Sequence, residues 1–175
     1  MSFFNIVAAT NEDTVVAAYE PSKVRSDSYQ REAELEKEFI RLLCEQGYTY
    51  LPLHTEDELI ANLRSQLEEL NHYRFSDTEW QQFFSDVIAN PNEHIPEKTR
   101  KIQEDNVQVL HRDDGSSKNI TLIDKKNIHN NRLQVINQYE VKQADGARHD
   151  NRYDVTILVN GFPLVHVELK RRGVA

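Results

Sequence analysis

The stretch from Asn151 to Gly173 reads N-R-Y-D-V-T-I-L-V-N-G-F-P-L-V-H-V-E-L-K-R-R-G. Two runs rich in β-branched residues, 153–159 and 164–170, flank the dipeptide Asn160-Gly161. Asn-Gly between such runs is the strongest short-range signal for a β-hairpin turn. The sequence therefore predicts a hairpin here, and we expect the rest of the fold to assemble around it.

Three charged residues interrupt this apolar hairpin: Asp154 in the first run, and Glu168 and Lys170 in the second. Charges inside a sheet are costly unless they are paired or bound to a metal. Glu168 and Lys170 are two residues apart, so their side chains share one face of the strand. Two carboxylates beside an ammonium can hold a hard cation, which can activate a water. The spacing alone leaves two interpretations open, a metal site and a structural ion-pair network.

The register of the hairpin decides whether the three charges can meet. A regular two-residue turn would pair Asp154 with Val167 and leave Glu168 on the opposite face. A three-residue connection or a β-bulge would instead pair Asp154 with Glu168 and gather the charges on one face. We therefore predict an odd-length connection or a bulge.

The run from Asp154 through Glu168-Leu169-Lys170 resembles the motif of PD-(D/E)XK nucleases. The surrounding sequence, N-R-Y-D-V-T-I-L-V-N-G and V-E-L-K-R-R-G-V, is similar to the N-terminal nuclease domain of the restriction (R) subunit of type I restriction–modification enzymes. The resemblance covers the chain from about residue 28 to its end. Upstream segments that agree with it are 34–48, 76–80, 98–102 and 122–127.

This resemblance implies an α/β, restriction-endonuclease-like core, in which helices flank a mixed central sheet. Residues 28–175 would form the nuclease domain and residues 1–27 an N-terminal arm. The family continues with a helix that carries a Gln-x-x-x-Tyr motif, for which the chain has no counterpart. We therefore expect a domain truncated after its second catalytic strand. The chain also lacks G-x-x-x-x-G-K-[ST], so ATP would bind only in ATPase and translocase domains outside it.

The resemblance further implies a type I site-specific deoxyribonuclease that hydrolyses phosphodiesters of double-stranded DNA with Mg²⁺. Asp154, Glu168 and the carbonyl oxygen of Leu169 would bind the Mg²⁺, and Lys170 would position or activate the attacking water. A specificity subunit would recognise the DNA sequence, and a modification subunit would act as the methyltransferase. Whether the fragment cuts DNA alone is left open.

A helix is predicted over 28–46 from an apolar stripe at Leu35, Phe39, Leu42 and Leu43. Glu36 lies beside this stripe, where a carboxylate is more often simply solvated. PD-(D/E)XK nucleases, however, often carry a glutamate on the first core helix about eleven residues before its Gly-Tyr-like end. Glu36 has that spacing from Gly47, with Glu32 one turn earlier. The resemblance thus implies that Glu36 holds a second cation or a metal-bound water.

The rest of the chain alternates between helix and strand patterns. Capping boxes at Thr55-x-x-Glu58 and Ser76-x-x-Glu79 predict two helix starts, followed by apolar residues at helical spacing. A short basic helix is predicted over 97–102. Period-two patterns predict strands at 107–111, 120–124 and 133–141.

The net charge of −8 argues against a dedicated electrostatic DNA binder, so other domains or subunits would hold most of the DNA. Two basic pairs, Lys125-Lys126 and Arg171-Arg172, are candidate phosphate contacts, although surface lysines are usually only solvated. The seven histidines show no metal-ligand spacing. His166 shares a strand face with Glu168, as a polar neighbour of the site or a general base.

The single cysteine, Cys44, excludes an internal disulfide, fits a reducing compartment and is expected to be buried. The sequence has no apolar run long enough to cross a membrane and no basic start typical of a secretory signal. These features predict a cytoplasmic protein.

Two alternative functions stay open. One is another PD-(D/E)XK enzyme, a repair nuclease or a resolvase, although the long helices predicted over 55–90 are a large insertion for a minimal resolvase. The other is a non-catalytic docking module, in which the hairpin charges only pair with one another. Binding of a divalent cation would separate the nucleases from the docking module.

Overall fold

The computed structural model describes residues 3–9, 15–20, 32–141 and 151–170, and divides the chain into Met1–Gln30 and Arg31–Ala175. In the first unit, β1 (Phe3–Ala9) pairs with β2 (Val15–Glu20) in an antiparallel ribbon. From the sequence, residues 1–27 were expected only to form an N-terminal arm. All other elements belong to the second unit, which carries the hairpin.

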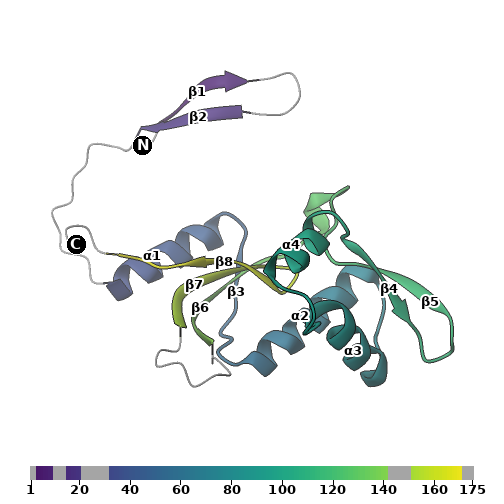
Figure 1. Ribbon diagram of the computed structural model, residues 1–175. Coiled ribbons are helices and arrows are strands. Elements are labelled where there is room, and N and C mark those ends of the chain that lie inside the picture. The colour runs from purple at the N-terminus through teal and green to yellow at the C-terminus, as the bar shows by residue number, and fades with distance from the viewer. Residues whose placement is uncertain (1–2, 10–14, 21–31, 142–150, 171–175) are drawn as a thin grey trace. The chain divides into compact units, whose positions relative to one another are not determined.

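A four-stranded mixed sheet forms the centre of the second unit (Figure 1). Its strand order is β3 (Thr49–Tyr50), β6 (Leu133–Val141), β7 (Asn151–Val159) and β8 (Phe162–Val167). β3 runs parallel to β6, and the other neighbours are antiparallel. The expected α/β class with a mixed sheet is therefore confirmed.

Helix α1 (Glu32–Glu45) packs on one face of this sheet. Leu43 forms a buried cluster with Val135 of β6 and Val155 of β7. This burial of apolar side chains supplies the main driving force for docking the helix on the strands. The predicted first helix thus packs against the hairpin strands, as expected.

Helix α2 (Glu56–Asn71) covers the other face. Leu59 packs against Ile136 of β6 and Leu158 of β7. Ile136 directly follows Val135, and neighbouring residues of a strand point to opposite faces. The hairpin strand β7 is therefore held between two helices.

The two predicted capping boxes are confirmed. The Thr55 hydroxyl accepts from the Glu58 amide at 3.3 Å, and Glu58 accepts from the Thr55 amide at 3.0 Å, which starts α2. Ser76 and Glu79 make the same reciprocal bonds at the start of α3 (Asp77–Phe83). Each box satisfies two backbone donors that the first helical turn leaves without partners.

After α3 the chain forms a π-helical turn (Phe84–Ile88), then α4 (Ile95–Gln103). The antiparallel pair β4 (Val107–His111) and β5 (Ser117–Thr121) follows, and a short 3₁₀ turn, η2 (Ile128–Asn130), leads into β6. The helix predicted over 97–102 is therefore longer than expected. The largest buried cluster joins α2, α3, β4, β5 and the first residue of β8: Leu63, Leu67, Phe75, Trp80, Phe83, Leu110, Ile120, Leu122 and Phe162.

Two local expectations are wrong. The strand predicted to reach Asp124 ends at Thr121, and the Asp124 carboxylate accepts instead from the Asn127 amide at 2.9 Å in the following turn. Cys44 is exposed, because its neighbour Leu43 takes the inward position and consecutive helical residues lie about 100° apart. In the part of the chain that is described, no helix is long and apolar enough to cross a membrane.

Candidate active site

The hairpin turn is built by Asn160 and Gly161, whose φ angles are 50° and 84°. Two positive φ angles are what a type I′ turn requires, and Asn-Gly adopts them most readily. The turn pairs Val159 with Phe162. The connection therefore has two residues, so the three-residue alternative is excluded.

A β-bulge then shifts the register within the hairpin. The shift falls between Ile157 and Leu158 of β7, after which Val155 pairs with Val167. β8 ends at Val167, and one further step in this register would set Asp154 opposite Glu168. The bulge predicted from the charges is thus present, and it gives the register in which the two residues can lie across from each other.

The three charges gather at the open end of the hairpin, directly after β8 ends. The Leu169 amide donates to Oδ2 of Asp154 at 2.7 Å, which orients the carboxylate toward the second chain segment. Nζ of Lys170 lies 3.5 Å from Oε1 of Glu168, and both side chains are largely exposed. The candidate DNA contacts at 171–172 lie outside the described residues.

Glu36 is buried on α1, with 9% of its surface exposed. Its carboxylate accepts from Nδ2 of Asn137 at 2.6 Å and from Nε2 of Gln138 at 3.4 Å, both on β6. Asn137 pairs with Val155, the residue next to Asp154. The Glu36 carboxylate is therefore not simply solvated. It contacts β6 at Asn137, whose partner on β7 is the residue next to Asp154.

Gln138 was not identified from the sequence, although it lies between Glu36 and the hairpin. Its φ angle is 54°, in the left-handed region, in the interior of a nine-residue strand. For a residue other than glycine this costs about 1 kcal/mol. The pairs on either side, Asn137 with Val155 and Tyr139 with Tyr153, place Gln138 opposite Asp154. Glutamine is not a residue that favours positive φ, so the sequence carries no signal for this feature.

The candidate site is therefore a row that crosses the sheet from Glu36 on α1, through Gln138 on β6 and Asp154 on β7, to Glu168 and Lys170 after β8. Across residues 32–141 and 151–170, no three or more His, Cys, Asp or Glu side chains group together so as to hold a metal. Glu36 thus does not join the two hairpin carboxylates in one such group. The hairpin offers a cation two carboxylates and nearby carbonyl oxygens, a donor set that hard cations prefer.

His166 is part of the strand pairing beside this row. Its Nδ1 lies 3.0 Å from the hydroxyl of Thr156, its partner across the hairpin, and its ring stacks on Tyr153 with centroids 4.1 Å apart. Burial lowers the pKa of His166 below its usual value. These contacts fix the ring in place and favour its neutral form.

Lys125 and Lys126 are exposed in the loop after β5. Asn160 in the hairpin turn donates to the carbonyl of Leu122 at 3.0 Å, so this loop starts at the turn end of the hairpin. Asp154 lies at the other end, roughly 20 Å away along an extended strand. The structure does not bring the two lysines to the carboxylates.

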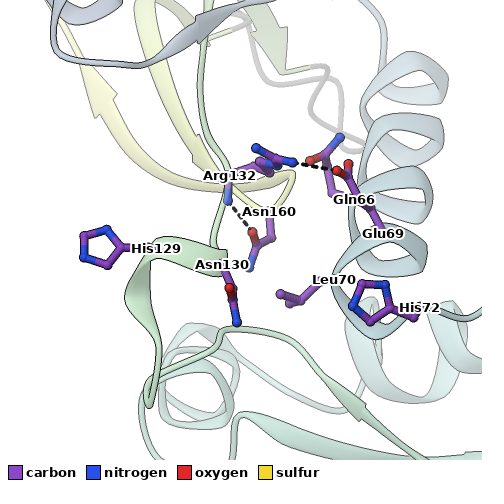
Figure 2. A pocket seen from close by; sticks show the side chains of 8 residues that line it. All are labelled: Gln66, Glu69, Leu70, His72, His129, Asn130, Arg132 and Asn160. Carbon is purple, nitrogen blue, oxygen red and sulfur yellow. Dashed lines mark hydrogen bonds and ion pairs between the residues drawn. The ribbon is translucent and has the colours of Figure 1, made fainter.

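A hollow of about 220 Å³ also lies at the turn end (Figure 2). Across it, Nη2 of Arg132 pairs with Glu69 at 2.8 Å, and the Arg132 amide donates to Oδ1 of Asn160 at 2.8 Å. Asn160 is 1% exposed. We interpret these contacts around the hollow as the ones that hold the hairpin turn against α2. Its lining is Gln66, Glu69, Leu70, His72, His129, Asn130, Arg132 and Asn160.

Comparison with known proteins gives a consistent result. The family model for the type I restriction enzyme R protein N terminus matches residues 29–175. The EcoprrI endonuclease subunit of Escherichia coli is 45% identical over 170 residues, which is 97% of this chain and 53% of that protein. The SsaAORF53P subunit of Staphylococcus saprophyticus is 36% identical over 151 residues, and SauMSSORF170P of Staphylococcus aureus is 37% identical over 152. The chain spans about half the length of the E. coli relative and 15% of the staphylococcal ones.

Proposed function

This chain belongs to the family of type I restriction enzyme R protein N termini, and from that premise we propose that it is the endonuclease domain of such an enzyme. The reaction is Mg²⁺-dependent hydrolysis of phosphodiesters in double-stranded DNA by a PD-(D/E)XK site. The observation that carries this proposal is the bulge in the hairpin, which gives the register that would set Asp154 opposite Glu168, next to Lys170. A regular two-residue hairpin would have separated the carboxylates.

Asp154 and Glu168 would hold the Mg²⁺ together with the carbonyl oxygen of Leu169. These are oxygen donors, which Mg²⁺ prefers, and water and a DNA phosphate can complete its coordination. When bound, the cation would supply Lewis-acid stabilisation of charge on the phosphoryl oxygens. The bond from the Leu169 amide holds Asp154 toward the segment that carries the other ligands, so the site is partly organised before a cation arrives.

Lys170 would position the attacking water and stabilise the negative charge that develops on the phosphate. Its ammonium already lies near Glu168, so it sits beside the proposed cation position. Glu36 would act from the far end of the row, on a second cation. Such a role explains why a buried carboxylate has only amide partners in the part of the chain that is described, where no ion pair involves it.

The names of the relatives, which describe endonuclease subunits of type I restriction enzymes, support a wider assembly, and most of these relatives are far longer than this chain. We propose that cleavage is independent of sequence at this domain, in the cytoplasm. A specificity subunit would then recognise DNA, a modification subunit would methylate it, and ATP would drive translocation in other domains. Lys125 and Lys126 would contact phosphates away from the cut bond, and the pair 171–172, which directly follows Lys170, would contact further phosphates of the DNA.

Titration of Mn²⁺ into the chain by calorimetry tests the metal site. We expect binding by the wild type and its loss in Asp154→Ala, because that variant removes one of two carboxylate ligands. Asp57→Ala, which removes an exposed carboxylate at the start of α2, should bind like the wild type. Equal binding by all three proteins would place the cation elsewhere.

The pairing of Lys170 with Glu168 also favours a second candidate, the non-catalytic docking module. In that function the hairpin charges neutralise one another and need no cation. Absence of Mn²⁺ binding in the wild type would therefore favour docking and contradict the nuclease site in this chain.

Lys170→Arg should not preserve cleavage. The guanidinium keeps the positive charge but is planar and more weakly hydrated, and it cannot place a single ammonium beside the water. We expect cleavage of plasmid DNA by the assembled enzyme to fall by about 100-fold, a loss in the range of general acid–base contributions. Lys37→Arg, a change at an exposed position of α1, is the matched control. Wild-type rates in Lys170→Arg would show that charge alone suffices.

A further inference from the structure

We propose that Gln138 is a positioning residue, which fixes the orientation of the Glu36 carboxylate at its end of the row. The inference rests on the proposed nuclease function and adds a residue to it. Gln138 is the member of the row that touches Glu36 through its side chain and lies opposite Asp154 through its backbone.

The backbone of Gln138 is the first observation. Its φ of 54° lies in the interior of β6, yet the pairs on both sides of it, Asn137 with Val155 and Tyr139 with Tyr153, keep the same register. The unfavourable angle is therefore not the by-product of a register shift. Such angles persist only where surrounding contacts impose them, and they concentrate at functional sites.

The second observation is what this angle achieves. Neighbouring side chains of a regular strand point to opposite faces. Here the amides of both Asn137 and Gln138 reach the two oxygens of Glu36, at 2.6 Å and 3.4 Å. The left-handed conformation thus turns Gln138 toward the same carboxylate as its neighbour.

The third observation is the chemistry of the two amides that donate to Glu36. Glu36 is 9% exposed, and a buried carboxylate is costly unless it is hydrogen-bonded and paired. Amide donors orient a carboxylate without cancelling its charge, whereas a lysine or arginine partner would neutralise it. The two amides therefore hold Glu36 in one orientation and keep its charge available to a cation.

The test uses Gln138→Gly in the assembled enzyme. Glycine relieves the strain of the positive φ, which offsets the loss of the 3.4 Å bond to Glu36, so the melting temperature should change little. The Mg²⁺ concentration for half-maximal DNA cleavage should nevertheless rise at least about tenfold, as for other groups that orient a metal ligand. Mn²⁺ affinity of the chain, measured by calorimetry, should weaken in the same direction.

Two controls separate a positioning role from a structural one. His72→Gly relieves a similar angle, 48° at the end of α2, and should leave the Mg²⁺ requirement unchanged. Because Gln138 acts through Glu36, the double variant with Glu36→Gln should need no more Mg²⁺ than Glu36→Gln alone. If the two substitutions raised the Mg²⁺ requirement independently, so that their factors multiplied in the double variant, the inference would be overturned. A wild-type Mg²⁺ requirement in Gln138→Gly would also overturn it.

Asp154→Asn in the same assay distinguishes failure of the proposed nuclease site from failure of the role of Gln138. If Asp154→Asn cuts DNA normally, the nuclease site itself is wrong. If Asp154→Asn is inactive while Gln138→Gly behaves as the wild type, the nuclease site stands and only the role of Gln138 fails.

Discussion

Alanine at Asp154, Glu168 or Lys170 should lower DNA cleavage by the assembled enzyme by at least about 10³-fold. A metal ion and its ligands contribute several kcal/mol to stabilisation of the transition state, and each 1.36 kcal/mol corresponds to a factor of ten in rate. With only two carboxylates at the hairpin, losing either leaves too few donors to hold the cation. Loss of Lys170 removes the ammonium beside them.

The fold should tolerate these substitutions, which makes the loss of cleavage interpretable. The side chains of Glu168 and Lys170 are 68% and 75% exposed, and an exposed ion pair contributes little stability. We expect unchanged thermal melting and unchanged ATP-driven translocation in the assembled enzyme, with Asp57→Ala as the matched control. Normal cleavage by any one of the three variants would refute the role assigned to that residue.

The bulge could be predicted from the sequence because the charged residues and the turn that sets the strand register lie within the same short hairpin, 151–170. Asp154 and Glu168 are costly inside a sheet unless they meet, and with the two-residue turn only an extra residue lets them meet. The position of that residue could not be predicted: it is Leu164 on β8, between Pro163 and Val165, whereas the charges require only that one residue be extra somewhere before them. The capping boxes were predictable for the same reason as the turn, because their partners are three residues apart.

Features that depend on contacts between distant segments were missed. The partners of Glu36 are about a hundred residues away on β6, so the sequence could place it only beside an apolar stripe. The left-handed angle of Gln138 is imposed by such contacts and not by its residue type. The exposed lysines 125–126 follow a strand, but only the anchoring of Asn160 on their loop shows that they lie at the turn end.

Gly161→Ala should be the most destabilising single substitution in the hairpin. A Cβ at this position would lie 2.6 Å from the Cα and 3.1 Å from the amide nitrogen of Leu63, in the backbone of α2. The turn cannot move aside easily, because the Asn160 side chain holds the Leu122 carbonyl and the Arg132 amide. The φ of 84° adds a cost of roughly 1 kcal/mol for alanine, and overpacking adds about 1–3 kcal/mol.

Urea unfolding should therefore show a free energy of unfolding lower by about 3 kcal/mol for Gly161→Ala. Gly115→Ala is the matched control, because Gly115 has nearly the same φ, 80°, but no atom within 4 Å of its would-be Cβ. That variant should lose only about 1 kcal/mol, the cost of the angle alone. Equal losses in both variants would mean that α2 does not press on the turn. A larger loss at Gly161 would show that the hairpin, and with it the height of Asp154 and Glu168, is fixed by the helix on which its turn rests.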